Sequence, residues 1–311
     1  MENTIFAANG VLPIFFVMII GNILKNKKIL SDEFYNSASK FVFMIATPAL
    51  LFSDTASVNF YETFDFKFVA SLLGTLLVFV ILLWIIIPAV VKDRVKAGAV
   101  IHCGYRSNFA ILGLPLLKNL LDISGVAKAE IILAFGIPLF NVVAVVCLSY
   151  FSSAKGDYKK VLKNTITNPL IIGALAGVIC SACKFEIPAV ITKTISYVGD
   201  TALGIGLIVL GASFDINKFL KSFKVTFLAT IVKIVISPLF GVLCMYLLGY
   251  RNDELVITFV YMGSSTAINS FIMAKEMKSD EELTAGAVVC TTGFSILTLF
   301  IGIYLLKLFG M

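Results

Sequence analysis

An arginine lies deep within a long apolar stretch of this sequence, where a charged side chain is costly and has a partner or a purpose. Arg106 is followed by Asn108, Gly113 and Pro115. Proline removes a backbone donor and glycine weakens helix preference, so we expect a helix over 96–121 to break between Asn108 and Pro115. Amide groups freed at the start of a half-helix, close to an arginine, suit an anion. The alternative is that Arg106 pairs with an internal carboxylate or carbonyl and only holds helices together.

A second polar run interrupts the apolar stretch 254–274. Ser265 and Asn269 are spaced i, i+4, which places them on one helix face, and Ser270 follows directly. Small residues allow helices to pack closely, but hydroxyl and amide groups at membrane depth also bind solutes, and we favour that role for Asn269. Asn141 is a weaker candidate for lining the same cavity. The candidate substrate-binding residues are Arg106, Asn108, Gly113, Pro115, Asn141, Ser265, Asn269 and Ser270.

Three further ionisable residues fall within apolar stretches. Asp200 and Lys233 have opposite signs, so they could form a structural ion pair; equally, either could serve a substrate or a coupling ion, with Asp200 binding Na⁺ or a proton. His102 precedes Arg106 by four residues and could relay protons near neutral pH, although a lone histidine is more often a packed core residue.

The usual signatures of enzymes and cofactor sites are missing from the sequence. No G-x-x-x-x-G-K-[ST], H-E-x-x-H or G-x-S-x-G motif occurs, and the six cysteines match no zinc, haem or disulfide framework. Cys180 and Cys183 have C-x-x-C spacing but end an apolar stretch, so thiol chemistry is a weak alternative. We therefore expect neither an enzyme nor a bound cofactor or metal.

The elements that position these residues are predicted to be membrane-spanning helices. Of 311 residues, 59% are hydrophobic and 14% are charged, and the mean hydropathy is +0.98, which is typical of an integral membrane protein. A helix needs about 20 apolar residues to cross the hydrocarbon core. Ten runs qualify, at 5–24, 36–53, 67–91, 96–121, 127–151, 168–183, 188–214, 223–248, 254–274 and 283–309. The predicted fold class is all-α, and the lipid bilayer is the expected environment.

The positive charges of the loops predict the orientation. Alternate loops carry 15 lysines and arginines on one face against 7 on the other, and the basic loops are expected to be cytoplasmic. Both termini then face outward from the plasma membrane. The first run has no basic segment before it and no small-residue cleavage site, so we keep it in the mature protein. Because orientation accounts for the net charge of +6, no nucleic-acid partner is expected.

The most basic loop lies at the middle of the chain, with five predicted spans on each side. An odd number of spans in the first half forces the second half to enter from the opposite face, so a repeat must be inverted, as in many secondary transporters. We expect a first repeat over 1–154, a cytoplasmic linker loop over 155–167 and a second repeat over 168–311. The runs 96–121 and 254–274, the fourth and ninth spans, are then counterparts.

Several segments together resemble the auxin efflux carrier family, which includes prokaryotic relatives described as malate or malonate permeases. The segments are Asn108-Phe-Ala-Ile-Leu-Gly-Leu-Pro-Leu-Leu117, Asn168-Pro-Leu-Ile-Ile-Gly173, Gly199-Asp-Thr-Ala-Leu203 and Ala274-Lys-Glu-Met277. The resemblance covers nearly the whole chain. It implies a fold similar to bile acid/sodium symporters, in which two broken helices cross, here at 108–115 and 265–270. It also implies a scaffold of the first, second, sixth and seventh spans, to which Asp200 would belong.

The sequence departs from the plant members of that family in two respects. Ser265 and Ser270 stand where the plant carriers have prolines, and the long cytoplasmic loop is missing. The resemblance therefore does not imply auxin as the substrate, although serine and asparagine can still hydrogen-bond the backbone groups that a helix break frees.

The leading hypothesis is a secondary active transporter of a small organic anion, a mono- or dicarboxylate, working by elevator-type alternating access. Arg106 and the amides after it would attract the carboxylate, while Asn108 and Asn269 would orient it. One alternative is a Na⁺-coupled symporter of a neutral or amphipathic solute. Another is a membrane-embedded enzyme or sensor that uses His102, Cys103 and Asp200. Coupling to H⁺ or Na⁺ and assembly into a homodimer are left open.

Overall fold

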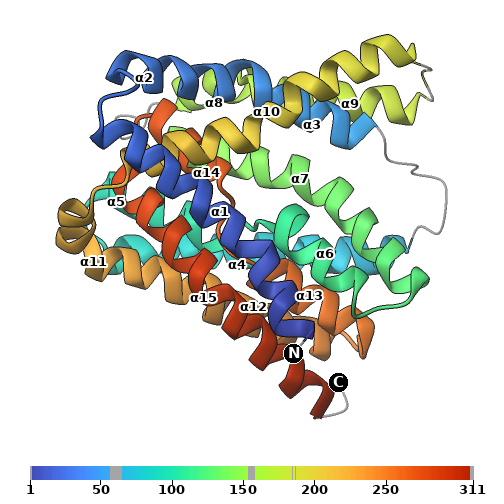
Figure 1. The fold of residues 1–311 in the computed structure, drawn as a ribbon. Helices are drawn as coiled ribbons and strands as arrows, with labels where there is room; N and C mark the ends of the chain where they lie inside the picture. The colour runs from blue at the N-terminus through green and yellow to red at the C-terminus, as the bar shows by residue number, and fades with distance from the viewer. Residues whose placement is uncertain (1, 57–64, 153–157, 184, 186, 309–311) are drawn as a thin grey trace.

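The computed structural model describes residues 2–56, 65–152, 158–183, 185 and 187–308 (Figure 1). Within these ranges the regular structure is helical apart from one isolated β-bridge. The elements are α1 (Glu2–Asn26), α2 (Asp32–Phe41), η1 (Val42–Ala46), α3 (Thr47–Ala56), α4 (Phe66–Val90), α5 (Arg94–Tyr105), η2 (Phe109–Gly113), α6 (Leu114–Lys118), α7 (Ile123–Ser152), α8 (Tyr158–Ile166), α9 (Pro169–Ala182), α10 (Ala189–Ser213), α11 (Ile216–Ile231), η3 (Val232–Ile236), α12 (Ser237–Leu247), α13 (Asp253–Gly263), α14 (Asn269–Glu276) and α15 (Glu281–Leu308).

Helices lie over all ten predicted apolar runs. By length and composition, five segments of the described chain can cross a membrane: α4, α7, α10, the stretch Ser222–Leu247 that joins α11, η3 and α12, and α15. The other runs are shorter or interrupted, so their crossing stays a prediction. The segment 155–167 is not simply the loop that the sequence predicts, because α8 occupies Tyr158–Ile166.

Three π-helical segments, η1, η2 and η3, each lead into a helix that has proline at its second position. The prolines are Pro48, Pro115 and Pro238. Proline has no amide hydrogen and cannot complete the α-helical ladder. In all three cases the residue before the proline donates instead to the carbonyl five residues earlier, which widens one turn and keeps the helix continuous.

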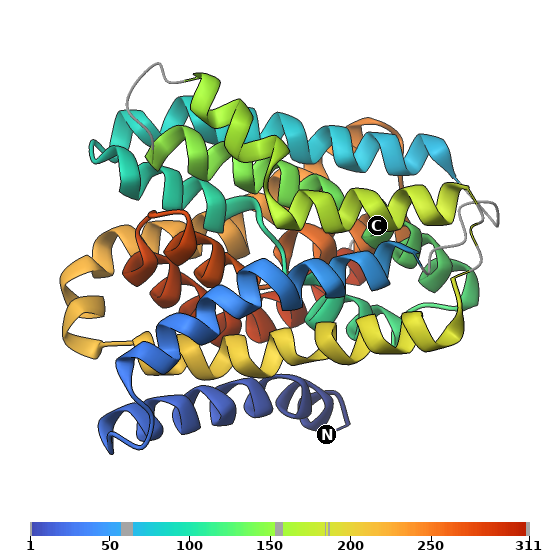
Figure 2. The same cartoon turned by 90° about the horizontal axis from the view of Figure 1, so that it is seen from above.

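The helices pack around two hydrophobic cores. One core joins α4, α5, α11, α12 and α13 with much of α7 and α15. The other is formed by α1, the continuous α2–η1–α3 segment, α9 and α10, against which α14 and one side of α7 pack. We call α1, α2–η1–α3, α9 and α10 the scaffold group, and the remaining helices except α8 the crossing group. Figure 2 shows α1 and α10 at one edge of the molecule and α4 at the opposite edge.

Glycines bring the scaffold helices into close contact. A Cβ atom on Gly211 would collide with the Met18 backbone of α1, and one on Gly21 would collide with Ile208 of α10. A Cβ atom on Gly173 of α9 would likewise collide with the Pro48 backbone of α3. Small residues that let backbones approach are a common basis of helix association in membranes, where apolar burial alone drives little.

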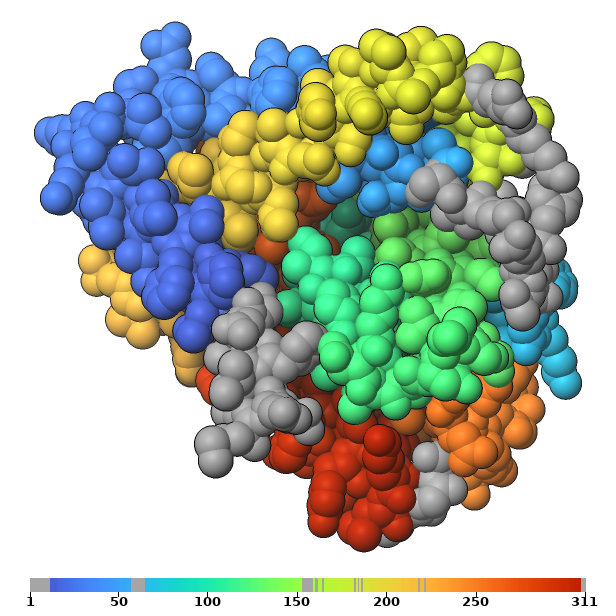
Figure 3. Space-filling view, turned by 45° about the vertical axis from the view of Figure 1, so that its right-hand side comes forward, coloured from blue at the N-terminus to red at the C-terminus, as the bar shows by residue number. Residues whose placement is uncertain are grey.

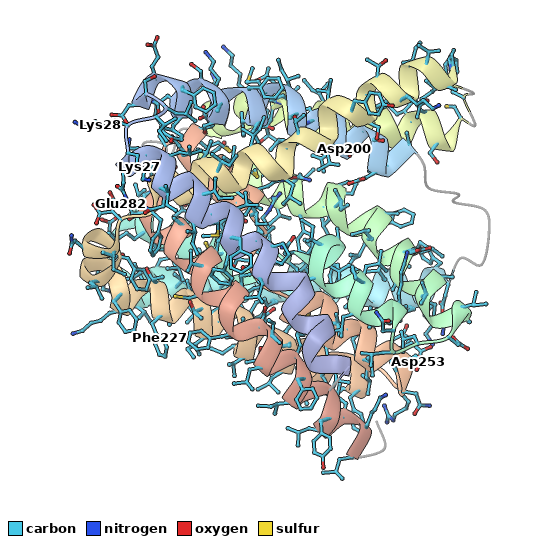
Figure 4. All side chains as sticks on the ribbon, in the orientation of Figure 1. Lys27, Lys28, Asp200, Phe227, Asp253 and Glu282 are labelled. Atoms are coloured by element: carbon cyan, nitrogen blue, oxygen red, sulfur yellow. The ribbon has the colours of Figure 1, made fainter. Side chains whose placement is uncertain are left out.

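The charged ends of the helices lie at opposite poles of the molecule. Lys27, Lys28 and Glu282 lie at one end and Asp253 lies at the other (Figure 4). The start of α1 and the end of α15 lie together (Figure 1), away from Lys27 and Lys28 (Figure 4). The two termini and the loop after α1 therefore lie at opposite ends of the molecule.

Candidate functional site

The first interrupted helix consists of α5, η2 and α6. α5 ends at Tyr105, the backbone is extended at Arg106 (φ −71°, ψ 118°), and helical structure resumes at Phe109. The break thus precedes the interval between Asn108 and Pro115, and the predicted position was wrong. The reason is that Pro115 lies in the first turn of α6, where the preceding π turn absorbs its missing donor.

The second interrupted helix, α13 and α14, meets the first at the two breaks. α13 ends at Gly263 and α14 begins at Asn269. The backbone amide of Asn108 donates to the carbonyl oxygen of Ser265 at 2.7 Å, and Ser107 pairs with Thr266 in the antiparallel bridge. The two broken helices therefore contact each other through their unwound backbones.

Gly113 allows this close approach. A Cβ atom at position 113 would lie 2.8 Å from Ser264 Oγ and would also collide with the Phe109 ring. Ser264 is held in place because its hydroxyl donates to the carbonyl oxygen of Val260 at 2.7 Å. Any side chain larger than hydrogen at position 113 would push the two broken helices apart.

The carbonyl ends of the two half-helices are bound by the protein's own donors. The Thr266 hydroxyl donates to the Cys103 carbonyl at 3.0 Å. The Lys233 ammonium donates to the Met262 carbonyl at 2.7 Å and to the Tyr105 carbonyl at 3.4 Å. Helix ends leave their last carbonyls without partners in the helix, and these contacts supply them. One lysine therefore contacts the C-terminal ends of both α5 and α13.

The suggested ion pair between Lys233 and Asp200 does not exist. Lys233 is fully buried in η3 of the crossing group, whereas Asp200 is exposed on α10 of the scaffold group, near Ser196 (Figure 4). Both residues lie near the middle of their sequence runs, but depth along a helix does not determine which face a side chain occupies. Asp200 therefore lies outside the crossing, and its scaffold role stays a prediction.

Arg106 points toward α7. Its guanidinium donates to Asn141 Oδ1 at 2.9 Å and to the Phe140 carbonyl at 3.4 Å, and Nε–H has no hydrogen-bond partner. Asn141 is held in turn by donation to the Ile137 carbonyl at 2.8 Å. Within the described chain the ion pairs are Lys25–Asp32, Lys118–Glu130 and Lys128–Glu254, so Arg106, only 5% exposed, has no carboxylate partner there.

Several polar atoms at the crossing lack partners within the described chain. They are Asn108 Nδ2 and the hydroxyls of Ser107, Ser265 and Ser270, all on side chains at most 7% exposed. A buried polar group without a hydrogen bond costs about 1–3 kcal/mol, so four in one place require an explanation. Asn269, at the start of α14, is half-buried beside them. The structure thus brings together Arg106, Asn108, Asn141 and the serines that the sequence singled out.

His102 lies in the last turn of α5, fully buried. Its Nδ1 is 3.5 Å from the Tyr105 hydroxyl, while Nε2 has no partner among the described atoms. The Arg106 amide still donates to the His102 carbonyl at 3.2 Å, so the last helical turn of α5 joins the two residues before the chain unwinds. No chain of hydrogen bonds in the described residues leads from His102 to the exterior, so a proton relay stays a prediction.

Aromatic side chains that the sequence analysis did not select form one wall of the crossing. Phe140 stacks on Tyr261 with ring centroids 5.2 Å apart, and Phe109 meets Tyr261 edge-on at 5.1 Å. Tyr105 adds a further stacked contact to Phe140 at 6.2 Å. In a chain with 27 phenylalanines and 10 tyrosines, composition does not distinguish these rings from lipid-facing ones.

The fold is similar to that of a solved membrane protein. The structure is similar to that of the sodium proton antiporter MjNhaP1 from Methanocaldococcus jannaschii, with a TM-score of 0.59 over 97% of this chain and 98% of that one, at 13% sequence identity. The likeness at this identity concerns the fold alone.

Sequence comparison identifies the family. The model of the membrane transport protein family, which comprises the auxin efflux carriers, matches residues 6–156 and 157–303, and the chain belongs to this family. Similar full-length relatives are uncharacterized transporters of Methanothermobacter thermautotrophicus (23% identity) and Methanocaldococcus jannaschii (22%), each aligned over 93% of this chain and 95% of its own length. A probable auxin efflux carrier component of Oryza sativa subsp. japonica is 26% identical over 42% of this chain and 23% of its own length. The chain is therefore a membrane transport protein and not an enzyme.

Proposed function

We propose that the protein is a secondary active transporter of a small organic anion, a mono- or dicarboxylate. The observation that carries this proposal is the buried Arg106, which has no carboxylate partner within the described chain and an Nε–H without a hydrogen bond. An unpaired buried charge is strongly destabilising, and a bound carboxylate would neutralise it.

The polarity of the half-helices supports the same ligand. The C-terminal ends of α5 and α13 are occupied by Lys233 and Thr266, whereas the opposite half-helices, η2–α6 and α14, begin at the break with their positive ends. Helix N-termini attract anions. Asn108, Ser265 and Ser270 lie at these starts and would orient the carboxylate by hydrogen bonds, with Asn269 beside them.

Access to the site requires movement. Because Arg106, Asn108 and Ser265 are at most 7% exposed, a ligand reaches them only when packed helices separate. The scaffold and crossing groups meet along a seam, with α10 and α3 on one side and α6 and α7 on the other (Figure 3). At one end of the seam a pocket is lined by Lys25, Asp32, Tyr35, Asn36, Ala212, Ser213 and Lys275. We propose that the crossing group slides against the scaffold group as an elevator.

The proposal includes the predicted topology. The repeats over 1–154 and 168–311 would each cross the plasma membrane five times, in inverted orientation, with both termini outside. The linker at 155–167, which contains α8, would lie on the cytoplasmic face. Lys27 and Lys28, at the end opposite the termini, would then face the cytoplasm (Figure 4).

The test is uptake of radiolabelled mono- and dicarboxylates into proteoliposomes, comparing Arg106→Ala with Arg94→Ala. Arg94 is the matched control because it lies on the same helix, α5, where it is held by the Tyr150 carbonyl and ring. We expect Arg106→Ala to lower uptake by at least about tenfold, the worth of one hydrogen bond to a charged group, and Arg94→Ala to retain it.

Two results would contradict the proposal. Uptake by Arg106→Ala at the wild-type level would make Arg106 a structural residue. If the wild-type protein neither bound nor exchanged any carboxylate, while a transporting relative did so in parallel, organic anions would be the wrong substrate class.

A further inference from the structure

A single ammonium group joins the two half-helices of the crossing. Lys233 is fully buried, and its nitrogen lies within 3.4 Å of the Tyr105 carbonyl and 2.7 Å of the Met262 carbonyl. Tyr105 is the last residue of α5, and Met262 is the second-last residue of α13. Ser237, the first residue of α12 directly after η3, also donates its hydroxyl to the Met262 carbonyl, at 3.2 Å.

The surroundings of Lys233 are those of a cation site. The C-terminal end of a helix carries a partial negative charge of about one half, so two such ends facing one point favour one positive charge. Carriers with discontinuous helices place Na⁺ or H⁺ at unwound carbonyls and half-helix C-terminal ends of this kind. Within the described residues Lys233 takes part in no ion pair, so these carbonyls are the negative groups that face it.

The local structure of η3 places Lys233 close to the crossing. The π turn of η3, which precedes Pro238, spans Val232–Ile236 and contains the lysine. Gly104 of α5 allows the approach, since a Cβ there would lie 2.7 Å from a methyl group of Val232. Because α5, η3 and α13 all belong to the crossing group, the ammonium stays with the half-helices if that group moves.

We propose that Lys233 is the resident cation of the crossing and replaces a diffusible Na⁺ there, so that substrate anions bind without Na⁺. This inference rests on the proposed function and adds the coupling requirement of the same site. Lys233 donates to carbonyls on the negative side of the crossing, whereas Arg106 is the cation left for the substrate. Lys233 is thus a positioning residue: it keeps the two carbonyl ends together and leaves the positive half-helix ends to the anion.

The first test uses the wild-type protein. Anion affinity is measured by thermal shift and uptake with a carboxylate that binds, in Na⁺, K⁺ and N-methyl-D-glucamine buffers of equal ionic strength. We expect affinities that agree within about twofold, since Na⁺ contributes no specific binding energy. A decrease of about tenfold or more on removal of Na⁺, equivalent to one well-placed interaction, would overturn the proposal.

The second test changes the charge of the side chain. Lys233→Arg keeps the positive charge, whereas Lys233→Met keeps the length and loses the charge. We expect Lys233→Met to lower anion affinity by at least about tenfold and Na⁺ to restore part of the loss, while Lys233→Arg retains most of the affinity. Equal losses of anion affinity in both variants would show that the shape of the side chain matters and its charge does not. That result would overturn the proposal. If Lys233→Met does not fold, the wild-type and Lys233→Arg measurements still decide.

Failure of this inference differs from failure of the proposed function. If the wild-type protein binds a carboxylate only in Na⁺ buffer, the proposed anion substrate stands and the proposed role of Lys233 is refuted. A wild-type protein that binds no carboxylate in any of the three buffers would refute the proposed function itself.

Discussion

Ser265 and Thr266 are neighbours at the crossing, but their hydroxyl groups differ in hydrogen bonding. The Ser265 hydroxyl has no partner within the described chain, whereas the Thr266 hydroxyl donates to the Cys103 carbonyl at 3.0 Å. The Thr266 amide is also bound, to Thr291 Oγ1 at 3.0 Å. Ser265 is therefore available to a ligand, while Thr266 is committed to the fold.

This difference predicts a separation of binding from stability. Ser265→Ala should leave thermal stability unchanged and weaken carboxylate binding about tenfold, the loss of one hydrogen bond. Thr266→Val keeps the side-chain shape but leaves a buried carbonyl unpaired, so it should destabilise the protein by about 1–3 kcal/mol. The measurements are thermal unfolding in detergent and ligand-induced thermal shift. A destabilised Ser265→Ala with unchanged affinity would assign Ser265 to packing.

The sequence predicted the members of the site better than their contacts. Arg106, Asn108, Asn141 and the serines are conspicuous because each is a polar group in an apolar run. The partner of Lys233 could not be predicted, because backbone carbonyls at a helix break carry no sequence signal. From the sequence, Asp200 was as good a candidate as Lys233 because its position in an apolar run indicates its depth in the membrane but not the helix face on which its side chain lies.

At the scale of helices, glycine contacts and proline positions govern the packing. Gly211 and Gly204 lie on the same helix, α10, seven residues apart. A Cβ on Gly211 would collide with the Met18 carbonyl of α1, whereas nothing lies within 4 Å of a Cβ on Gly204. The two positions therefore form a matched pair for testing the α1–α10 contact.

Alanine should destabilise the protein at position 211 and should not destabilise it at position 204. Gly211→Ala should lower stability by about 1–3 kcal/mol because it overpacks two backbones. Gly204→Ala should be neutral or stabilising by up to about 1 kcal/mol, since alanine is the better helix former. Thermal unfolding of both variants in the same detergent checks this, and equal stabilities would show that α1 and α10 do not pack as closely as described.

The positions of the prolines do not coincide with the helix breaks. Pro115 was expected to break the helix over 96–121, yet the unwinding lies upstream at Arg106–Asn108 and Pro115 follows a continuous π turn. The second break has no proline and still unwinds, because the two breaks satisfy one another through the Asn108–Ser265 hydrogen bond. A contact between residues so distant in sequence cannot be read from either run alone.

At the scale of the whole molecule, the seam between the two groups determines whether an elevator movement is feasible. Ser39 of α2, in the scaffold group, donates to Glu276 Oε1 of α14, in the crossing group, at 2.6 Å. In contrast, Thr55 of α3 donates to the Ala174 carbonyl of α9 at 3.2 Å, within the scaffold group. A covalent link at the first pair would join the groups, and one at the second would not.

Cross-linking these pairs should distinguish a moving seam from a fixed one. In a background without the native cysteines, oxidation of Ser39→Cys/Glu276→Cys should abolish uptake, and a reductant should restore it. Oxidation of Thr55→Cys/Ala174→Cys should leave uptake intact, because it joins helices that are expected to move together. Full uptake by the completely cross-linked first pair would exclude sliding at this seam.

The fold class and the positions of the helices followed from apolar runs, since membrane-spanning segments need length and little else. The division into a scaffold group and a crossing group did not follow from the residues themselves. It depends on which helices share glycine contacts, such as Gly211 with Met18, and these contacts join segments from both halves of the chain. It came only from the family resemblance and stays a proposal, since the second hydrophobic core joins the scaffold helices to parts of α7, α14 and α15.

The bonds between the two breaks also constrain how the chain is synthesised. The Cys103 carbonyl receives its donor from Thr266, 163 residues later, and the Tyr105 carbonyl receives its donor from Lys233, 128 residues later. In lipid an unsatisfied carbonyl costs several kcal/mol. During synthesis, the carbonyls at the end of α5 therefore lack these donors until most of the second half has been translated. A chain cut short before Lys233 would lack the donors to both the Tyr105 and the Cys103 carbonyls.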